Sequence, residues 1–169
     1  MNVPHPAVMR RFLQRDLEQI RRSWYVFLFQ LPWIPEAGMK RDNWRGAEQV
    51  LRGSGKIHTF TNQDIEKYKE AWSQPGAMTA MINWYRALIR HIPKLPQDPR
   101  IKVPTLMMWG MKDFALSHRM ARPSMDYVDD GNLILFPEAT HWVHLDAAEE
   151  VNHYLIDFIF DKASKIVVR

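Results

Sequence analysis

The chain has 169 residues, of which 46% are hydrophobic and 12% aromatic, so it can form a sizeable core and is unlike a disordered segment. It contains no cysteine, which excludes disulfides, thiolate metal sites and a cysteine nucleophile, and we expect a cytoplasmic protein. The net charge is +4, and basic residues alternate with acidic ones, as in RRFLQRDLEQIRR. This pattern is typical of solvated helix faces and argues against a nucleic-acid surface. We also expect no membrane span, because no apolar run approaches the roughly 20 residues that cross a bilayer.

Helical periodicity dominates the first part of the chain. Apolar residues recur at close to 3.6-residue spacing over residues 8–28, which predicts one long amphipathic helix that ends before Pro32. A loop-rich connection with one short helix over residues 44–51 follows. Thr61 and Asp64 have the spacing of a capping box and predict the start of a second helix. The apolar pattern predicts a third helix from Met78 to Pro93.

Two short apolar runs in the second part of the chain predict β-strands. These runs are VPTLMMWG and NLILFPEA, and the polar segment SHRMARPSMDYVDDG between them predicts a helix. A strand, helix, strand unit of this kind has a right-handed crossover, so the two strands should be parallel. Asp146 and Glu149 have the spacing of another capping signature, which predicts the start of a closing helix.

An aspartate and a histidine follow the two predicted strands. Asp113 lies in WGMKDFALS and His141 in PEATHWVHLD. Because the carboxyl ends of parallel strands meet at one edge of a sheet, we expect the carboxylate to reach the imidazole and orient it as a base. The residues alone leave the alternative that Asp113 caps a helix and His141 is a hydrogen-bonded core histidine.

The same stretch also has the pattern H-x-x-H-x-D, formed by His141, His144 and Asp146. Two histidines three apart can bind a metal from one helical face, but this stretch leaves a strand and begins a helix only at Asp146. We therefore expect no metal and no cofactor. His144 is interpreted as a packing or surface residue, and Asp146 as the cap of the last helix.

Five segments, in this order and at these separations, resemble the epoxide hydrolases of the α/β-hydrolase fold: NVPHP, SWYVFLFQLPWIPE, NWYRA, VPTLMMWGMKD and ATHWV. The resemblance covers nearly the whole chain, and SWYVFLFQLP with NWYR is its most specific part. It implies an α/β chain with a partial α/β-hydrolase fold, in which a helical cap precedes two parallel strands with flanking helices. Residues 1–7 would end a core strand and its loop, residues 8–98 would form the cap, and residues 99–169 the C-terminal part of the core.

The resemblance also implies roles for four side chains. Tyr25 and Tyr85 would donate hydrogen bonds to the epoxide oxygen from two cap helices. His141 would be the base that activates water, and Asp113 would orient His141. The implied reaction converts a small-molecule epoxide and water into a vicinal diol through an alkyl-enzyme ester.

The nucleophile aspartate of this family has no counterpart among the 169 residues. No aspartate or serine has the flanking glycines in the spacing of a nucleophile elbow, although RGSGK at residues 52–56 comes nearest. The HG-plus-proline oxyanion segment is also missing. We therefore expect a truncated catalytic set, a chain that is inactive alone, and self-association or pairing with an N-terminal half.

Two other interpretations remain open from the sequence. Haloalkane and fluoroacetate dehalogenases share the sheet, the histidine and the aspartate nucleophile, although the tyrosine pair argues against them. A non-catalytic fragment or pseudoenzyme is the alternative outside enzymes.

Overall fold

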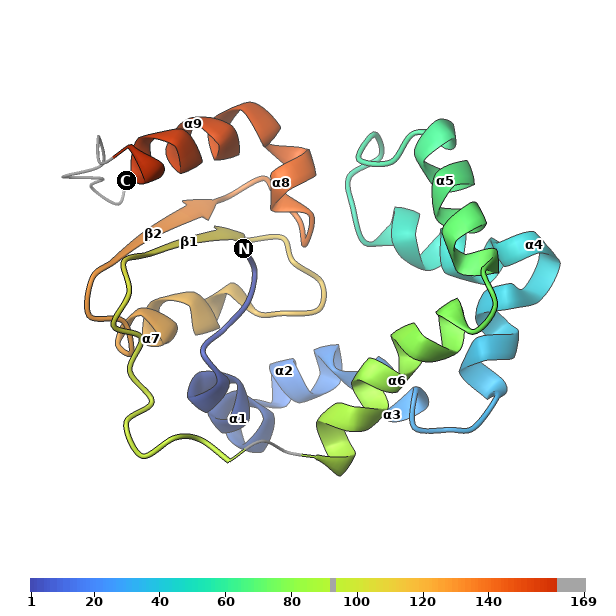
Figure 1. Ribbon diagram of the computed structural model, residues 1–169, viewed down its shortest axis with the longest axis horizontal. Helices are drawn as coiled ribbons and strands as arrows, with labels where there is room; N and C mark the ends of the chain where they lie inside the picture. Colours follow the sequence, from blue (N-terminus) through green and yellow to red (C-terminus); the bar gives the residue numbers. More distant parts are fainter. Residues whose placement is uncertain (92–93, 161–169) are drawn as a thin grey trace. The chain divides into compact units, whose positions relative to one another are not determined.

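The computed structural model describes residues 1–91 and 94–160, which form two compact units (Figure 1). In the described part of the chain, one unit comprises Met1–Arg22 and residues 95–160, and the other comprises residues 23–91 and Lys94. The predicted division into residues 1–7, 8–98 and 99–169 stays a prediction. Its parts at residues 92–93 and 161–169 lie outside the described residues.

The first unit contains a pair of parallel strands between helices. Its elements are α1 (Pro6–Arg15), α2 (Leu17–Arg22), β1 (Thr105–Gly110), the 3-10 helix η1 (His118–Met120), α7 (Ala121–Met125), β2 (Gly131–Phe136), α8 (Val143–Asp146) and α9 (Ala148–Ile159). The register runs from Thr105 opposite Gly131 to Gly110 opposite Phe136. The prediction of two parallel strands with a helix between them is confirmed.

Both faces of this sheet are covered. Successive side chains of a strand point to opposite faces. Met107 and Trp109 accordingly pack in one cluster with residues of α1, η1 and α7, whereas Met108 packs in a second cluster with residues of α8 and α9. Figure 1 shows α9 on one side of the two strands and α7 on the other. Because β1 and β2 are parallel, their carboxyl ends lie at the same edge of the sheet, where the loops that carry Asp113 and His141 begin.

The prediction of one long helix over residues 8–28 is wrong. The segment contains α1, α2 and α3 (Trp24–Leu28), separated at Asp16 and Ser23. The backbone of Asp16 is extended (φ −109°, ψ 103°), and its carboxylate accepts a hydrogen bond from the backbone N–H of Gln19 at 2.9 Å. Asp16 thus ends one helix and caps the next, a role that short acidic side chains favour over the helix interior.

The second unit is helical and consists of α3, α4 (Ile34–Gly53), α5 (Asn62–Ser73) and α6 (Ala77–Arg90). The short helix predicted at residues 44–51 is the end of α4, which is kinked at residues 41–44. The predicted capping box is confirmed, since Thr61 and Asp64 exchange side-chain and backbone hydrogen bonds at the start of α5. The third predicted helix corresponds to α6, and Pro93, its predicted end, lies outside the described residues.

The interpretation of Asp146 as the cap of the last helix is also wrong. Asp146 is the final residue of α8, and α9 begins after Ala147 without a side-chain cap. The Asp146 carboxylate instead accepts from the backbone N–H of Thr140 at 2.7 Å and from its hydroxyl at 2.6 Å. It therefore fixes the loop that leads to His141.

In the described part of the chain, we find no helix whose length and apolar character would let it cross a membrane.

Candidate active site

The structure brings Asp113 and His141 together at the carboxyl ends of β1 and β2. Nδ1 of His141 lies 2.8 Å from Oδ2 of Asp113. The Asp113 side chain has no exposed surface, whereas 34% of the His141 side chain is exposed. The buried partner of the pair is therefore the carboxylate, and the imidazole is open to solvent. The catalytic roles of both residues stay predictions.

Four donors surround the Asp113 carboxylate. Oδ1 accepts from the backbone N–H groups of Ala115 at 2.8 Å and Leu116 at 3.0 Å, and Oδ2 accepts from Asn2 at 2.7 Å and from His141. Burial by itself raises the pKa of Asp113, but the hydrogen bonds, that of His141 first, outweigh burial and hold the pKa below its usual value. The carboxylate thus stays charged and keeps the proton of His141 on Nδ1.

Nε2 of His141 has no hydrogen-bond partner among the described residues. In a neutral imidazole whose Nδ1 carries the proton, Nε2 is the basic nitrogen. The arrangement can therefore take a proton from a water molecule at Nε2 while Asp113 stabilises the resulting imidazolium.

The His141 loop approaches β1 so closely that only glycine fits at position 110. A Cβ atom there would lie 2.0 Å from the carbonyl oxygen of Thr140 and 2.7 Å from that of Ala139. The backbone N–H of Lys112 also donates to Ala139 at 2.9 Å. These contacts hold the loops that carry Asp113 and His141 against each other.

Three polar side chains that the sequence reasoning missed hold the Asp113 loop. Asn2 bonds the carboxylate, Gln19 bonds the carbonyl of Ala115 and the N–H of Ser117 at 2.9 Å each, and Arg22 donates to the carbonyl of Asp113. Asn2 and Gln19 are buried. The one sequence signal for Gln19 is its place between Leu17 and Ile20 of α2, and the signal for Asn2 is its place in NVPHP, one of the segments that resemble epoxide hydrolases.

The two tyrosines of the predicted site both lie in the second unit, Tyr25 on α3 and Tyr85 on α6. Their rings meet edge to face with centroids 5.7 Å apart, and Phe29 packs against both. Burial raises the pKa of Tyr85, so its hydroxyl keeps its proton over a wider pH range and can act as a donor. Their role toward an epoxide stays a prediction.

A buried ion pair fixes α3 and α6 around these rings. Arg86 pairs with Glu36 at 2.7 Å and donates to the carbonyls of Phe29 at 2.9 Å and Leu31 at 2.7 Å. The hydrogen bond from Arg86 holds the pKa of Glu36 below its usual value despite burial. Because the guanidinium binds both the carboxylate and the turn after α3, it sets the separation of the two tyrosine-bearing helices.

The alternative of a metal site at H-x-x-H-x-D gains no support. Residues 1–91 and 94–160 contain no group of three His, Asp or Glu side chains placed to hold a metal ion, and the Asp146 carboxylate is bonded to Thr140. His144 is exposed and lies against Trp142.

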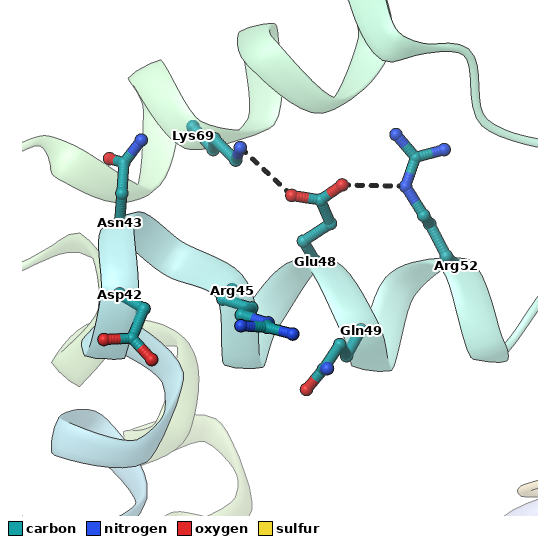
Figure 2. Close-up of a pocket in the computed structure, with 7 residues that line it drawn as sticks. All are labelled: Asp42, Asn43, Arg45, Glu48, Gln49, Arg52 and Lys69. Atoms are coloured by element: carbon teal, nitrogen blue, oxygen red, sulfur yellow. Dashed lines mark hydrogen bonds and ion pairs between the residues drawn. The ribbon is translucent and has the colours of Figure 1, made fainter.

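The second unit also has a surface hollow of about 530 Å³ between α4 and α5, shown in Figure 2. Glu48 lies in its wall and pairs with Arg52 at 2.9 Å and with Lys69 at 3.0 Å. Both cations are therefore already held in ion pairs, and none of the predicted site residues lines the hollow. We assign it no role.

Comparisons with known proteins agree with this architecture. The chain is 38% identical to the AB hydrolase superfamily protein YfhM of Bacillus subtilis and 34% identical to epoxide hydrolase 2 of Caenorhabditis elegans, over 94% of the chain in both cases. It spans about half the length of these curated relatives, 55% of the first and 46% of the second. No family model matches the chain.

A solved structure of an epoxide hydrolase variant from Bacillus megaterium is similar with a TM-score of 0.78 at 22% sequence identity. The similarity covers 92% of this chain and 57% of that one. At this identity it shows the fold, and the predicted α/β-hydrolase fold is confirmed.

Proposed function

Because the chain has the α/β-hydrolase fold and is similar, over nearly its whole length, to a C-terminal portion of epoxide hydrolases, we propose that it carries the water-activating and epoxide-binding side chains of such an enzyme. The proposed reaction converts a small-molecule epoxide and water into a vicinal diol and uses no cofactor. The observation that carries the proposal is the 2.8 Å hydrogen bond between His141 and buried Asp113, with Nε2 of His141 open to a water molecule.

In the proposed reaction, an aspartate outside this chain attacks an epoxide carbon and forms an alkyl-enzyme ester. Nε2 of His141 then takes a proton from water, and the hydroxide formed attacks the carbonyl carbon of the ester. The bond between the ester carbonyl carbon and the alkyl oxygen then breaks. The two protons of the water end on the two oxygens of the diol, one of them by way of His141, which restores the aspartate carboxylate and neutral His141. General-base catalysis of this kind contributes about 10²- to 10⁴-fold to a rate, and Asp113 supports it by stabilising the imidazolium.

Tyr25 and Tyr85 are the proposed donors to the epoxide oxygen. Opening the ring places negative charge on that oxygen, so two phenol groups would act as an oxyanion hole. The contact of the two rings supports this role because it places both phenol side chains in one part of the second unit, and the raised pKa of Tyr85 supports it because the hydroxyl keeps its proton.

The absence of a nucleophile elbow from the sequence supports the further proposal that this chain alone does not turn over epoxides. Its partner would be an N-terminal half or a second copy of the chain, since the described residues supply a sheet of only two strands and the edge of a sheet can pair with another chain. The cytoplasmic location stays a prediction that rests on the lack of cysteine.

A chimera tests the proposal. This chain replaces the matching segment of Caenorhabditis elegans epoxide hydrolase 2, and diol formation from styrene oxide is measured for the chimera, for the same chimera with His141→Gln, and for the chain alone. We expect diol from the chimera only. A folded chimera that forms no diol contradicts the proposed function, and halide release from a haloalkane in its place would indicate a dehalogenase. Diol formation by the chain alone would contradict the proposal that its catalytic residues are incomplete.

A further inference from the structure

The side chain of Asn2 lies between the two loops of the acid and base pair. It is 2% exposed. Its Nδ2 donates to Oδ2 of Asp113 at 2.7 Å and to the carbonyl oxygen of Thr140 at 3.2 Å, and its Oδ1 accepts from the backbone N–H of Gly110 at 3.0 Å. One amide therefore touches the end of β1, the acid, and the residue that precedes His141.

The contacts of Asn2 require a side chain that donates to Asp113 and accepts from Gly110 at the same time. Oδ2 of Asp113 needs a donor and the N–H of Gly110 needs an acceptor, and a carboxamide supplies both from one planar group. The backbone of Asn2 has φ +45°, a left-handed conformation that asparagine, aspartate and glycine adopt more readily than other residues. Its N–H donates to the carbonyl of Met108 at 3.0 Å, which fixes this backbone against β1.

Asn2 and His141 bond the same carboxylate oxygen. Oδ2 of Asp113 receives Nδ2 of Asn2 at 2.7 Å and Nδ1 of His141 at 2.8 Å, while Oδ1 is held by the backbone. A second donor on Oδ2 restricts rotation of the carboxylate, and the bond to Thr140 restricts the loop that carries the imidazole. One buried amide thus holds both the acceptor of this hydrogen bond, Asp113, and the loop of its partner, His141.

We propose that Asn2 is a positioning residue of the water-activating pair: its amide fixes the carboxylate of Asp113 and the backbone before His141 in the geometry in which Nε2 faces water. The inference rests on the proposed function, because it assigns Asn2 a part in the same site. Asn2 lies outside the loops that carry Asp113 and His141, and its proposed role is to align these two loops.

Nuclear magnetic resonance of the full 169-residue chain tests this role through the Nδ1 proton of His141. Asn2→Gly keeps the left-handed backbone conformation and removes the amide. We expect exchange of the Nδ1 proton with water to become about 10- to 100-fold faster, because a hydrogen bond to a charged group contributes that much to a closed state. The ring signals of His153, an exposed histidine on α9, serve as the internal control and should not change. Unchanged exchange at His141 in a folded Asn2→Gly chain would overturn the proposal.

Asn2→Asp adds a rescue that depends on pH. A protonated Asp at this position still donates to Asp113, whereas an ionised one repels it, and two adjacent carboxylates raise the pKa of the pair. We expect exchange close to wild type at acid pH and faster exchange as the pH rises through the pKa of the pair. The other charged groups near this point are His141, Arg22 and the amino group of Met1, which all variants share. Asn152→Asp adds the same charge at an exposed position on α9 and should show no such dependence.

A measurement on the unaltered chain covers the case in which both Asn2 variants unfold. The side-chain amide protons of Asn2 should be protected from exchange, because Nδ2 donates to Asp113 and to Thr140 inside the protein. Amide protons that exchange freely would refute the role of Asn2. None of these readouts uses a substrate, so a chimera without diol formation would refute the proposed function and leave the Asn2 result standing.

Discussion

At the scale of single residues, Asp113 keeps its charge inside the protein because four donors surround its carboxylate. A buried carboxylate without partners would take up a proton, and a protonated Asp113 could not stabilise an imidazolium at His141. In the proposed reaction, these hydrogen bonds would therefore support catalysis as well as the fold. They also link the stability of the site to pH.

The pH dependence of stability follows from the lowered pKa of Asp113. The unfolded chain holds the proton more tightly, so the stabilising contribution is fully present above the unfolded pKa of about 3.9 and is lost as the pH falls through the folded pKa. We expect Asp113→Asn to cost about 1.5–3 kcal/mol at neutral pH, as for a hydrogen bond to a charged group. In urea unfolding, the difference between the two proteins should shrink in acid. A difference that is independent of pH would contradict this account.

The sequence placed Asp113 and His141 together because both follow predicted parallel strands, and the structure has them within hydrogen-bond distance. It could not predict Asn2, Gln19 or Arg22. These side chains reach Asp113 or its loop from far away in the sequence, and no local pattern encodes such a contact.

At the scale of elements, the site depends on how closely the loop after β2 approaches the end of β1. Gly110 permits this approach, and Asp146 at the end of α8 holds Thr140 from the other side. The capping pattern at Asp146 and Glu149 was misleading because α8 intervenes, and tertiary contacts use the carboxylate instead. Likewise, the helical period of residues 8–28 continues through α1, α2 and α3, although breaks at Asp16 and Ser23 divide them.

Gly110→Ala tests the close approach. The added Cβ would meet backbone oxygen at 2.0 Å, so the His141 loop must move. We expect a loss of about 1–3 kcal/mol in the free energy of unfolding, as for other overpacked sites, and a changed Nδ1 resonance of His141. Gly53→Ala is the matched control, because nothing lies within 4 Å of its added Cβ. Equal effects of the two substitutions would show that position 110 has no special constraint.

At the scale of the whole molecule, the chain has the acid and base pair in one unit and the tyrosine pair in the other. The two strands and the helical character of the rest were predictable because hydrophobic periodicity and capping residues are local features of the sequence. The motifs that suggested epoxide hydrolases extend across both units, and the curated relatives agree, although the chain spans about half of their length. What the sequence could not supply is the packing that holds the tyrosine helices, such as the buried pair of Arg86 and Glu36.

The central claim is that His141 activates the water that hydrolyses an alkyl-enzyme ester. Mass spectrometry of the chimera with Caenorhabditis elegans epoxide hydrolase 2, incubated with styrene oxide, tests this claim most directly. With His141→Gln, ester formation should proceed while hydrolysis stalls, so the account predicts a chimera whose mass is increased by one styrene oxide and no such adduct without the substitution. A His141→Gln chimera that forms no adduct, or that releases diol as fast as the unsubstituted chimera, would contradict it.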